Sequence, residues 1–258
     1  MINNATICAE LSGTLLTVRL PDPSAGGLSR KALSDLATTL EQTNENDAVS
    51  VVLLVGGSSV FCLGVDLEEF AGPDGLDEMA GVLSRCFRAF AGLDRPMIVV
   101  VAGAAIGFGA SLMCYADVVV ATPTATFEAP FVGLGLLPEA ASTLLLPNRI
   151  GYLRAMRFLC LGEAIGADEA QACGLVTEIE ACDPQGRATA IAQRLARMPP
   201  DSVRTTRRLM RGDPKEIDRR IELEVTVCRR RLDDPKLRRR VSLFAAAARS
   251  AQRRTGTA

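Results

Sequence analysis

Three short apolar runs rich in β-branched residues constrain the fold of this chain more than any other feature. They are VVLLV at 51–55, MIVVV at 97–101 and VVVA at 118–121. Runs of this length without alternating polar residues are typical of strands buried on both faces, as in a parallel sheet covered by helices. Before the first run, the spacing of apolar residues over 31–46 predicts an amphipathic helix, and residues 76–93, between the first two runs, are also predicted to be helical. This order of elements predicts an α/β domain.

The two ends of the chain differ from this central pattern. ATICAELSGTLLTVRL, near the N-terminus, alternates enough to predict two short strands with a turn at Ser12-Gly13. Toward the C-terminus the sequence becomes mostly helical, with long charged helices expected after Pro184. We therefore expect a core over residues 1–190 and a C-terminal helical region over residues 191–258.

Charge is distributed unevenly along the chain, although the net charge is only −1. Residues 1–186 carry 9 basic and 22 acidic side chains, whereas residues 187–258 carry 20 basic and 8 acidic ones. A basic C-terminal region fits a nucleic-acid interface, a solvated helix face, contact with a phosphorylated ligand, or docking on an acidic body of the same or a neighbouring subunit. Aromatic residues make up 4% of the chain and tryptophan is absent, so stacking platforms for nucleic acid are not expected.

The chain contains no histidine, which excludes catalytic triads built on histidine and histidine-ligated metals. Proton transfer must therefore rest on Asp, Glu, Lys, Tyr or Cys. The eight cysteines form no CxxC pair, and most lie in apolar stretches typical of small buried side chains in a reducing compartment. The N-terminal residues do not resemble a signal peptide, so we expect a cytoplasmic protein.

Twenty consecutive residues, 97–116, carry no charge and have the length of a membrane-spanning helix. However, Pro96 and the run IVVV precede three glycines within seven positions, at 103, 107 and 109. This order favours a buried strand, a glycine turn and the start of a helix. We expect no membrane span.

Two stretches depart from regular structure where buried strands end, the place where α/β proteins usually bind ligands. They are FCLGVDL at 61–67, in which Asp66 is placed to cap a short helix, and AGAAIGFGAS at 102–111. Small residues allow the backbone to turn sharply and leave amide groups without strand partners. Two such amides can form an oxyanion hole. Spacing alone equally allows two tight strand-to-helix turns without any binding role.

One carboxylate, Glu139, stands alone among the apolar and small residues of VGLGLLPEAASTLLLP at 132–147. A carboxylate in such surroundings is costly unless it has a function or a partner. Pro138-Glu139 also suits the first turn of a helix, which would give Glu139 only a local structural role. Both interpretations remain open on spacing alone.

Several segments, taken together and in order, resemble the crotonase (enoyl-CoA hydratase/isomerase) superfamily over nearly the whole chain. They are RKALSDL, VFCLGVDLEEF, AGAAIGFGASLMCYADVVVAT, ATFEAPFVGLGLLPEAASTLLLPNRIG and ADEAQACGLVTEI. The resemblance implies a spiral of ββα units with a C-terminal helical assembly region, a homotrimer or hexamer, and an acyl-CoA thioester substrate. It implies no cofactor, since CoA is part of the substrate, and no nucleic-acid partner.

The resemblance also assigns roles to residues. The backbone amides of Leu63 and Phe108 are expected to bind the thioester oxygen. The substrate site is expected to include, in addition, Arg30, Lys31, Gly64, Asp66, Gly107, Phe131 and Phe244. Of these, Arg30 and Lys31 are expected near the CoA nucleotide, and Phe244 is expected to contact adenine from a neighbouring subunit.

A hydratase of this family uses two glutamates, and the matching positions here hold Ser111 and Phe131. Glu139 instead occupies the position of the single catalytic acid of the peroxisomal-type 3,2-enoyl-CoA isomerase branch. Apolar surroundings should raise its pKa toward the range of a general base. The resemblance therefore implies an isomerase. The alternatives are another crotonase reaction, such as a residual hydratase, and an acyl-CoA-binding protein without catalysis.

Overall fold

The computed structural model describes residues 7–22, 26–71, 75–232, 234–237, 239–241 and 243. Its main sheet has six strands in the order β1-β2-β3-β5-β7-β10. The strands are β1 (Cys8–Ser12), β2 (Leu15–Arg19), β3 (Val51–Val55), β5 (Met97–Val101), β7 (Val118–Ala121) and β10 (Glu178–Ile179). All neighbours in this sheet are parallel except β1 and β2, which form the expected antiparallel pair. The three apolar runs are confirmed as buried strands, and the structure places them next to one another at the centre of the sheet.

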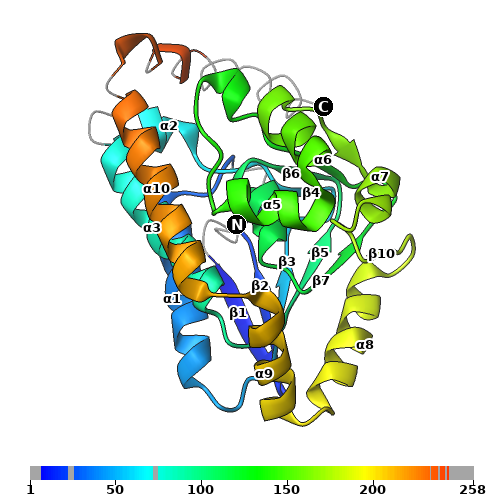
Figure 1. Ribbon diagram of the computed structural model, residues 1–258. Helices are drawn as coiled ribbons and strands as arrows, with labels where there is room; N and C mark the ends of the chain where they lie inside the picture. Colours follow the sequence, from blue (N-terminus) through cyan, green and yellow to red (C-terminus); the bar gives the residue numbers. More distant parts are fainter. Residues whose placement is uncertain are drawn as a thin grey trace, which may run out of the picture.

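A second, smaller sheet, which the sequence did not predict, lies beside the first. Its order is β4-β6-β8-β9, formed by β4 (Val60–Cys62), β6 (Ala104–Ile106), β8 (Thr126–Glu128) and β9 (Ile165–Gly166). Each central strand of the main sheet is followed along the chain by a short strand of this second sheet. The chain thus alternates between the sheets as it winds, which agrees with the expected spiral of ββα units (Figure 1).

Both faces of the main sheet are covered. On one face, Val52, Leu54 and Val99 belong to the main core, which includes side chains of α1 (Arg30–Glu45) and α3 (Gly75–Gly92). On the other face, Leu53 and Ile98 pack with small residues of α8 (Pro184–Ala196). Alternate side chains of each strand therefore enter different cores, which explains why these strands are apolar throughout.

The remaining helices are mostly short and connect the strands or close the C-terminal half. They are α2 (Leu67–Ala71), α4 (Phe108–Ser111), α5 (Ser142–Ile150), α6 (Tyr152–Met156), α7 (Ala167–Ala172), α9 (Pro200–Arg211) and α10 (Pro214–Leu232), with the single turns η2 (Leu112–Cys114), η3 (Val132–Leu134) and η4 (Arg157–Leu161). The uncharged stretch 97–116 forms β5, β6, α4 and η2. Among the described residues, no helix combines the length and the apolar character that crossing a bilayer requires.

The C-terminal helices pack on the body, and their basic side chains meet its acidic ones. Helix α10 runs along α3 (Figure 1), while α8 lies on the main sheet, so the boundary expected at residue 190 falls inside a packed helix. Arg207 of α9 binds the carboxylate of Asp117 at 2.7 Å, and Arg229 of α10 binds Asp77 of α3 at 3.4 Å. Docking on the acidic body therefore accounts for part of the charge asymmetry.

The cysteines are all free thiols. Cys62, Cys86, Cys114 and Cys173 are buried, as expected for small apolar side chains. Cys8, Cys160 and Cys182 are exposed, so the interpretation as buried side chains fails for these three.

Candidate active site

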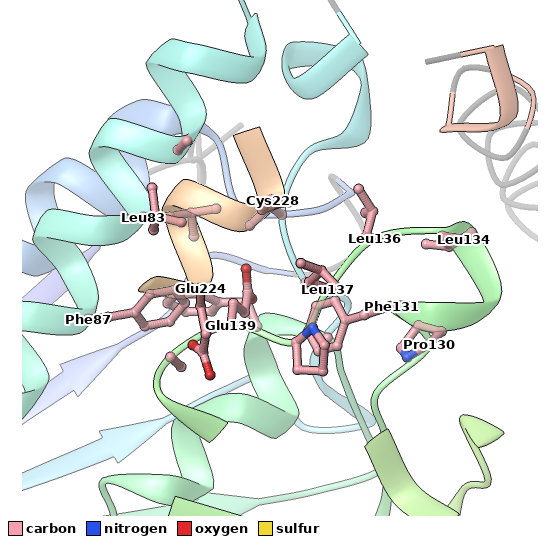
Figure 2. Close-up of a pocket in the computed structure, with 18 of the residues that line it drawn as sticks. Leu83, Phe87, Pro130, Phe131, Leu134, Leu136, Leu137, Glu139, Glu224 and Cys228 are labelled. Atoms are coloured by element: carbon pink, nitrogen blue, oxygen red, sulfur yellow. The ribbon is translucent and has the colours of Figure 1, made fainter. Parts of the chain in front are cut away.

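A mainly apolar cavity of about 140 Å³ opens between the second sheet and helices α3 and α10 (Figure 2). The β4–α2 segment and the β6–α4 turn contribute to its lining, as do residues 130–140 and one side of α10. Leu83, Phe87 and Val225 are among its apolar residues, and its two carboxylates are Glu139 and Glu224. Elements far apart in the sequence therefore meet in one pocket.

The two predicted glycine turns lie in direct contact in this pocket. Gly64 has φ +89° and Gly107 has φ +55°, backbone conformations that favour glycine. A Cβ atom added to Gly64 would lie 3.3 Å from the carbonyl oxygen of Ile106 and 3.8 Å from the backbone nitrogen of Phe108. Leu63 and Phe108, which adjoin these two glycines in the sequence, both line the cavity.

The Phe108 side chain is part of the core beneath the pocket. It is 1% exposed, and its ring centroid lies 5.4 Å from that of Phe87 and 6.5 Å from that of Phe90. The aromatic side chain at this turn is therefore accommodated by packing with other rings. Phe131 is buried too and lines the cavity.

Glu139 lies in the irregular segment that precedes α5. It is not in the first turn of that helix, which begins at Ser142; instead its carbonyl oxygen accepts a hydrogen bond from the Ser142 amide at 3.0 Å. Its side chain lines the cavity and is of intermediate exposure, since the cavity opens to solvent. Among the described residues, no hydrogen bond or ion pair to its carboxylate is found. The local structural role considered from the sequence therefore does not explain this side chain.

The surroundings of Glu139 favour its neutral form. Burial, with a smaller contribution from the charge of Glu224, raises the pKa of Glu139 from 4.5 to about 8. The direction agrees with the prediction from its apolar neighbours. A carboxyl group with such a pKa can exchange protons near neutral pH.

The turn that follows Glu139 has an uncommon backbone conformation. Ala140 has φ +65° and Ala141 has φ +53°, both in the left-handed region although neither is glycine. Such residues cost about 1–2 kcal/mol each and persist only where surrounding contacts hold them. One such contact is the hydrogen bond from the Tyr115 hydroxyl to the Ala140 carbonyl oxygen at 2.7 Å.

The other contact comes from Glu224 of α10, a residue that the sequence analysis missed. Its Oε2 accepts from the Ala141 amide at 2.8 Å, and its Oε1 accepts from the Thr143 hydroxyl at 2.6 Å and the Thr143 amide at 3.2 Å. Glu224 is 8% exposed. Burial raises its pKa to about 7, against the opposing effect of these hydrogen bonds.

A sequence signal for Glu224 did exist. Ile217 and Ile221 are buried on one face of α10, and Val225 and Cys228 continue that face toward the cavity. At a spacing of seven from Ile217 and three from Ile221, Glu224 lies on the same face. The sequence therefore indicated an acidic residue on the apolar face of an amphipathic helix, although it did not indicate the hydrogen-bond partners of that residue.

The other predicted residues lie at different distances from the cavity. Asp66 caps α2 as predicted, accepting from the Glu68 amide at 2.8 Å. Arg30 and Lys31 begin α1 and do not line the cavity; Arg30 pairs with Glu69 and Glu78, and Lys31 with Asp35. Phe244 lies outside the described residues.

Comparisons with known proteins agree with this architecture. The family model described as enoyl-CoA hydratase/isomerase matches residues 10–244. Enoyl-CoA delta isomerase 2 of Rattus norvegicus is 33% identical over 219 residues, 81% of this chain and 55% of that protein. The 2,3-dehydroadipyl-CoA hydratase of Escherichia coli K12 is 30% identical over 198 residues, 76% of this chain and 77% of that protein.

A solved structure shares the fold. The enoyl-CoA hydratase/isomerase from Pseudoalteromonas atlantica T6c is 30% identical and superposes with a TM-score of 0.85 over 93% of this chain and 96% of that one. Sequence, architecture and pocket agree, and the chain belongs to the enoyl-CoA hydratase/isomerase family.

Proposed function

We propose that this chain is a 3,2-enoyl-CoA isomerase, which moves a double bond of an acyl-CoA from C3 to C2 with Glu139 as the acid/base. The observation that carries this proposal is the state of Glu139: a carboxylate without hydrogen-bond partners among the residues that the structure describes, in an apolar pocket, with its pKa raised to about 8. The isomerase of Rattus norvegicus, a relative at 33% identity, supports the same assignment.

The chemistry requires one proton to leave C2 and one to arrive at C4. Ionised Glu139 removes the C2 proton, and the electron pair of that C–H bond forms a dienolate whose negative charge rests on the thioester oxygen. Protonated Glu139 then returns the proton at C4, and the double bond closes between C2 and C3. One carboxylate that titrates near neutral pH can perform both steps.

The dienolate oxygen needs hydrogen-bond donors, and the Leu63 and Phe108 backbone amides are proposed for this role. The two glycine turns that carry them are in contact, and both residues line the cavity that contains Glu139. Two converging amides in a site with little water typically contribute a factor of ~10²–10³ in rate per donor.

Hydration is the second candidate function, because the pocket contains a second carboxylate and a hydratase is among the relatives. A hydratase needs two carboxylates that activate and orient water. Both oxygens of Glu224 already accept hydrogen bonds from Ala141 and Thr143. The positions that carry the hydratase glutamates hold the buried residues Ser111 and Phe131. Isomerisation is therefore favoured.

Turnover of a trans-3-enoyl-CoA to the 2-enoyl product tests the proposal, with crotonyl-CoA hydration measured in parallel. We expect isomerisation by the native protein and a ~10²–10⁴-fold lower kcat for Glu139→Gln, with acyl-CoA binding retained. Glu128→Gln is the matched control, since Glu128 is close in sequence but does not line the cavity. Hydration at equal rates in native protein and Glu139→Gln contradicts the assignment. Acyl-CoA binding without turnover identifies the site as a binding pocket only.

We also propose a homotrimeric or hexameric assembly with an acyl-CoA site whose nucleotide end lies near Arg30 and Lys31. Large apolar side chains are exposed on α6 and α9, including Leu153 at 79% and Met210 at 82%. Side chains of this kind are typical of interfaces between subunits. Sedimentation equilibrium should give three or six times the mass of one chain, and a monomer mass would contradict the proposal. Lys31→Ala should raise KM for acyl-CoA and leave KM for a thioester without the nucleotide unchanged.

A further inference from the structure

Two carboxylates lie in the same pocket but differ in their surroundings. In Figure 2, Glu224 extends from α10, whereas Glu139 comes from the segment before α5. Glu224 accepts three hydrogen bonds from Ala141 and Thr143, and Glu139 makes none that the structure describes. Nothing in the proposed reaction requires Glu224, and no basic side chain in the described ranges forms an ion pair with its carboxylate, so its burial needs another explanation.

The hydrogen-bond partners of Glu224 indicate that explanation. Its carboxylate binds the turn immediately after Glu139, where two consecutive alanines have positive φ angles of 65° and 53°. Within the described part of the chain, the Glu139 side chain has no hydrogen bond that could fix its direction. Its placement therefore depends on the backbone of this turn, which Glu224 holds from α10 and Tyr115 holds from the body.

We propose that Glu224 is a positioning residue for Glu139: its carboxylate fixes the turn from Ala140 to Thr143, and its negative charge disfavours ionisation of the neighbouring carboxylate. This inference rests on the proposed role of Glu139 as the acid/base. The raised pKa of Glu139, to which the charge of Glu224 contributes, supports the electrostatic part. The geometry of the three hydrogen bonds supports the positional part.

The other titratable and charged groups around Glu139 and Glu224 do not take the place of the interaction between these two carboxylates. They are Cys62 of β4, Cys86 of α3, Cys114 of η2, Tyr115 after η2, and Arg220, Cys228 and Arg229 of α10. Burial raises the pKa of each of these thiols and of the phenol, so they are neutral near pH 7. Arg220 donates to the Thr143 hydroxyl at 3.1 Å and lowers the pKa of Glu224.

Glu224→Gln is the direct test, because it keeps the size of the side chain and removes its charge. An amide offers one acceptor oxygen in place of two, and its NH₂ group would face one of the donors. The matched control is Glu222→Gln, on the same helix, where the carboxylate is exposed and pairs with Arg88 at 2.6 Å. For the folded fraction of each variant we measure kcat and KM, together with the titration of Glu139 by ¹³C-carboxyl NMR, assigned with Glu139→Gln.

We expect Glu224→Gln to lower kcat by ~10–100-fold, as for a misplaced catalytic group, and to change KM by less than about twofold. The titration midpoint of Glu139 should move to lower pH by about half a unit or more, since a neighbouring negative charge is removed. Glu222→Gln should change neither quantity. A Glu224→Gln protein that is less stable but keeps the native kcat and the native Glu139 midpoint overturns the proposal.

Thr143→Val provides a second test if Glu224→Gln does not fold. It removes the hydroxyl donor to Glu224 and keeps the charge, so kcat should fall by a smaller factor of about 3–10. A native kcat in Thr143→Val would overturn the positional part. If native protein shows no isomerase turnover, the proposed function fails, while the NMR midpoints still decide whether Glu224 acts on Glu139.

Discussion

The irregular segment from Phe131 to Ala141 and the regular helix α10 each place one carboxylate in the pocket. The two carboxylates differ in their hydrogen-bond partners. Glu139 lies in a segment with strained backbone and has no hydrogen-bond partner among the described residues. Glu224 lies in a regular helix and uses both oxygens as acceptors. A group that must exchange protons with a substrate needs free oxygens, whereas a group that holds a backbone turn needs occupied ones. The difference in partners thus separates the two roles although both side chains are acidic and lie in one cavity.

A double-mutant cycle of Glu139→Gln and Glu224→Gln tests the different roles of the two carboxylates most directly, and we expect its effects on kcat to be the largest. In the native background, Glu224→Gln is expected to lower kcat ~10–100-fold. In a Glu139→Gln background the same change should lower the residual kcat by less than about threefold, because the group that Glu224 positions is absent. Isomerase kinetics on the four proteins check this. Equal losses in both backgrounds would mean that Glu224 acts independently of Glu139.

The pH dependence of kcat/KM should show whether the base has a raised pKa, as expected for Glu139. The base must be ionised, and Glu139 has its pKa raised to about 8. We expect kcat/KM to rise about tenfold per pH unit below that pKa and to become constant above it. Steady-state rates between about pH 5.5 and 9 measure this. A profile that is flat across this range would exclude a base with a raised pKa.

The two regions also differ in how far the sequence revealed them. Glu139 was found because one carboxylate stands out in an apolar segment and because that segment resembles a known family. Glu224 was missed because its partners, Ala141 and Thr143, lie about eighty residues away and no local pattern indicates that contact. The acidic residue on the buried face of α10 was the only available signal.

The same distinction between local and distant information applies to the fold. The central strands were predicted because five apolar residues in a row, such as 51–55, identify a strand buried on both faces. The second sheet was not predicted, because three-residue strands such as Val60–Cys62 are too short to show a period. The glycine turns were recognised, yet only the structure shows that Gly64 and Phe108 meet.

The pH dependence of stability should reveal the cost of burying the Glu139 carboxylate, which has no partner among the described residues. The pKa of Glu139 rises from its ordinary value of 4.5, which applies to the unfolded chain, to about 8 in the folded state. The folded state therefore holds the proton more tightly than the unfolded state does. The unfolding free energy should therefore fall as pH rises between these values and change no further above about pH 8. The neutral side chain of Glu139→Gln does not ionise, so the unfolding free energy of this variant should not fall in the same way. We expect the variant to be more stable than native protein by about 1–3 kcal/mol at about pH 9. At about pH 4 the two should be equally stable. Urea unfolding at both pH values checks this, and a variant that is less stable at high pH would contradict it.

Tyr115→Phe should have the smallest effect and tests whether the turn depends on Glu224 more than on the body. The change removes the hydrogen bond to the Ala140 carbonyl oxygen at 2.7 Å, and the ring remains stacked on Phe90 at 5.8 Å. A lost buried hydrogen bond costs about 1–3 kcal/mol, and we expect a loss of unfolding free energy at the lower end of this range. Because Glu224 still holds the Ala141 amide, kcat should fall by less than about threefold. Urea unfolding and isomerase kinetics measure the two quantities. If Tyr115→Phe lowered kcat as strongly as Glu224→Gln, the body and α10 would hold the turn equally, and the special role of α10 would have to be abandoned.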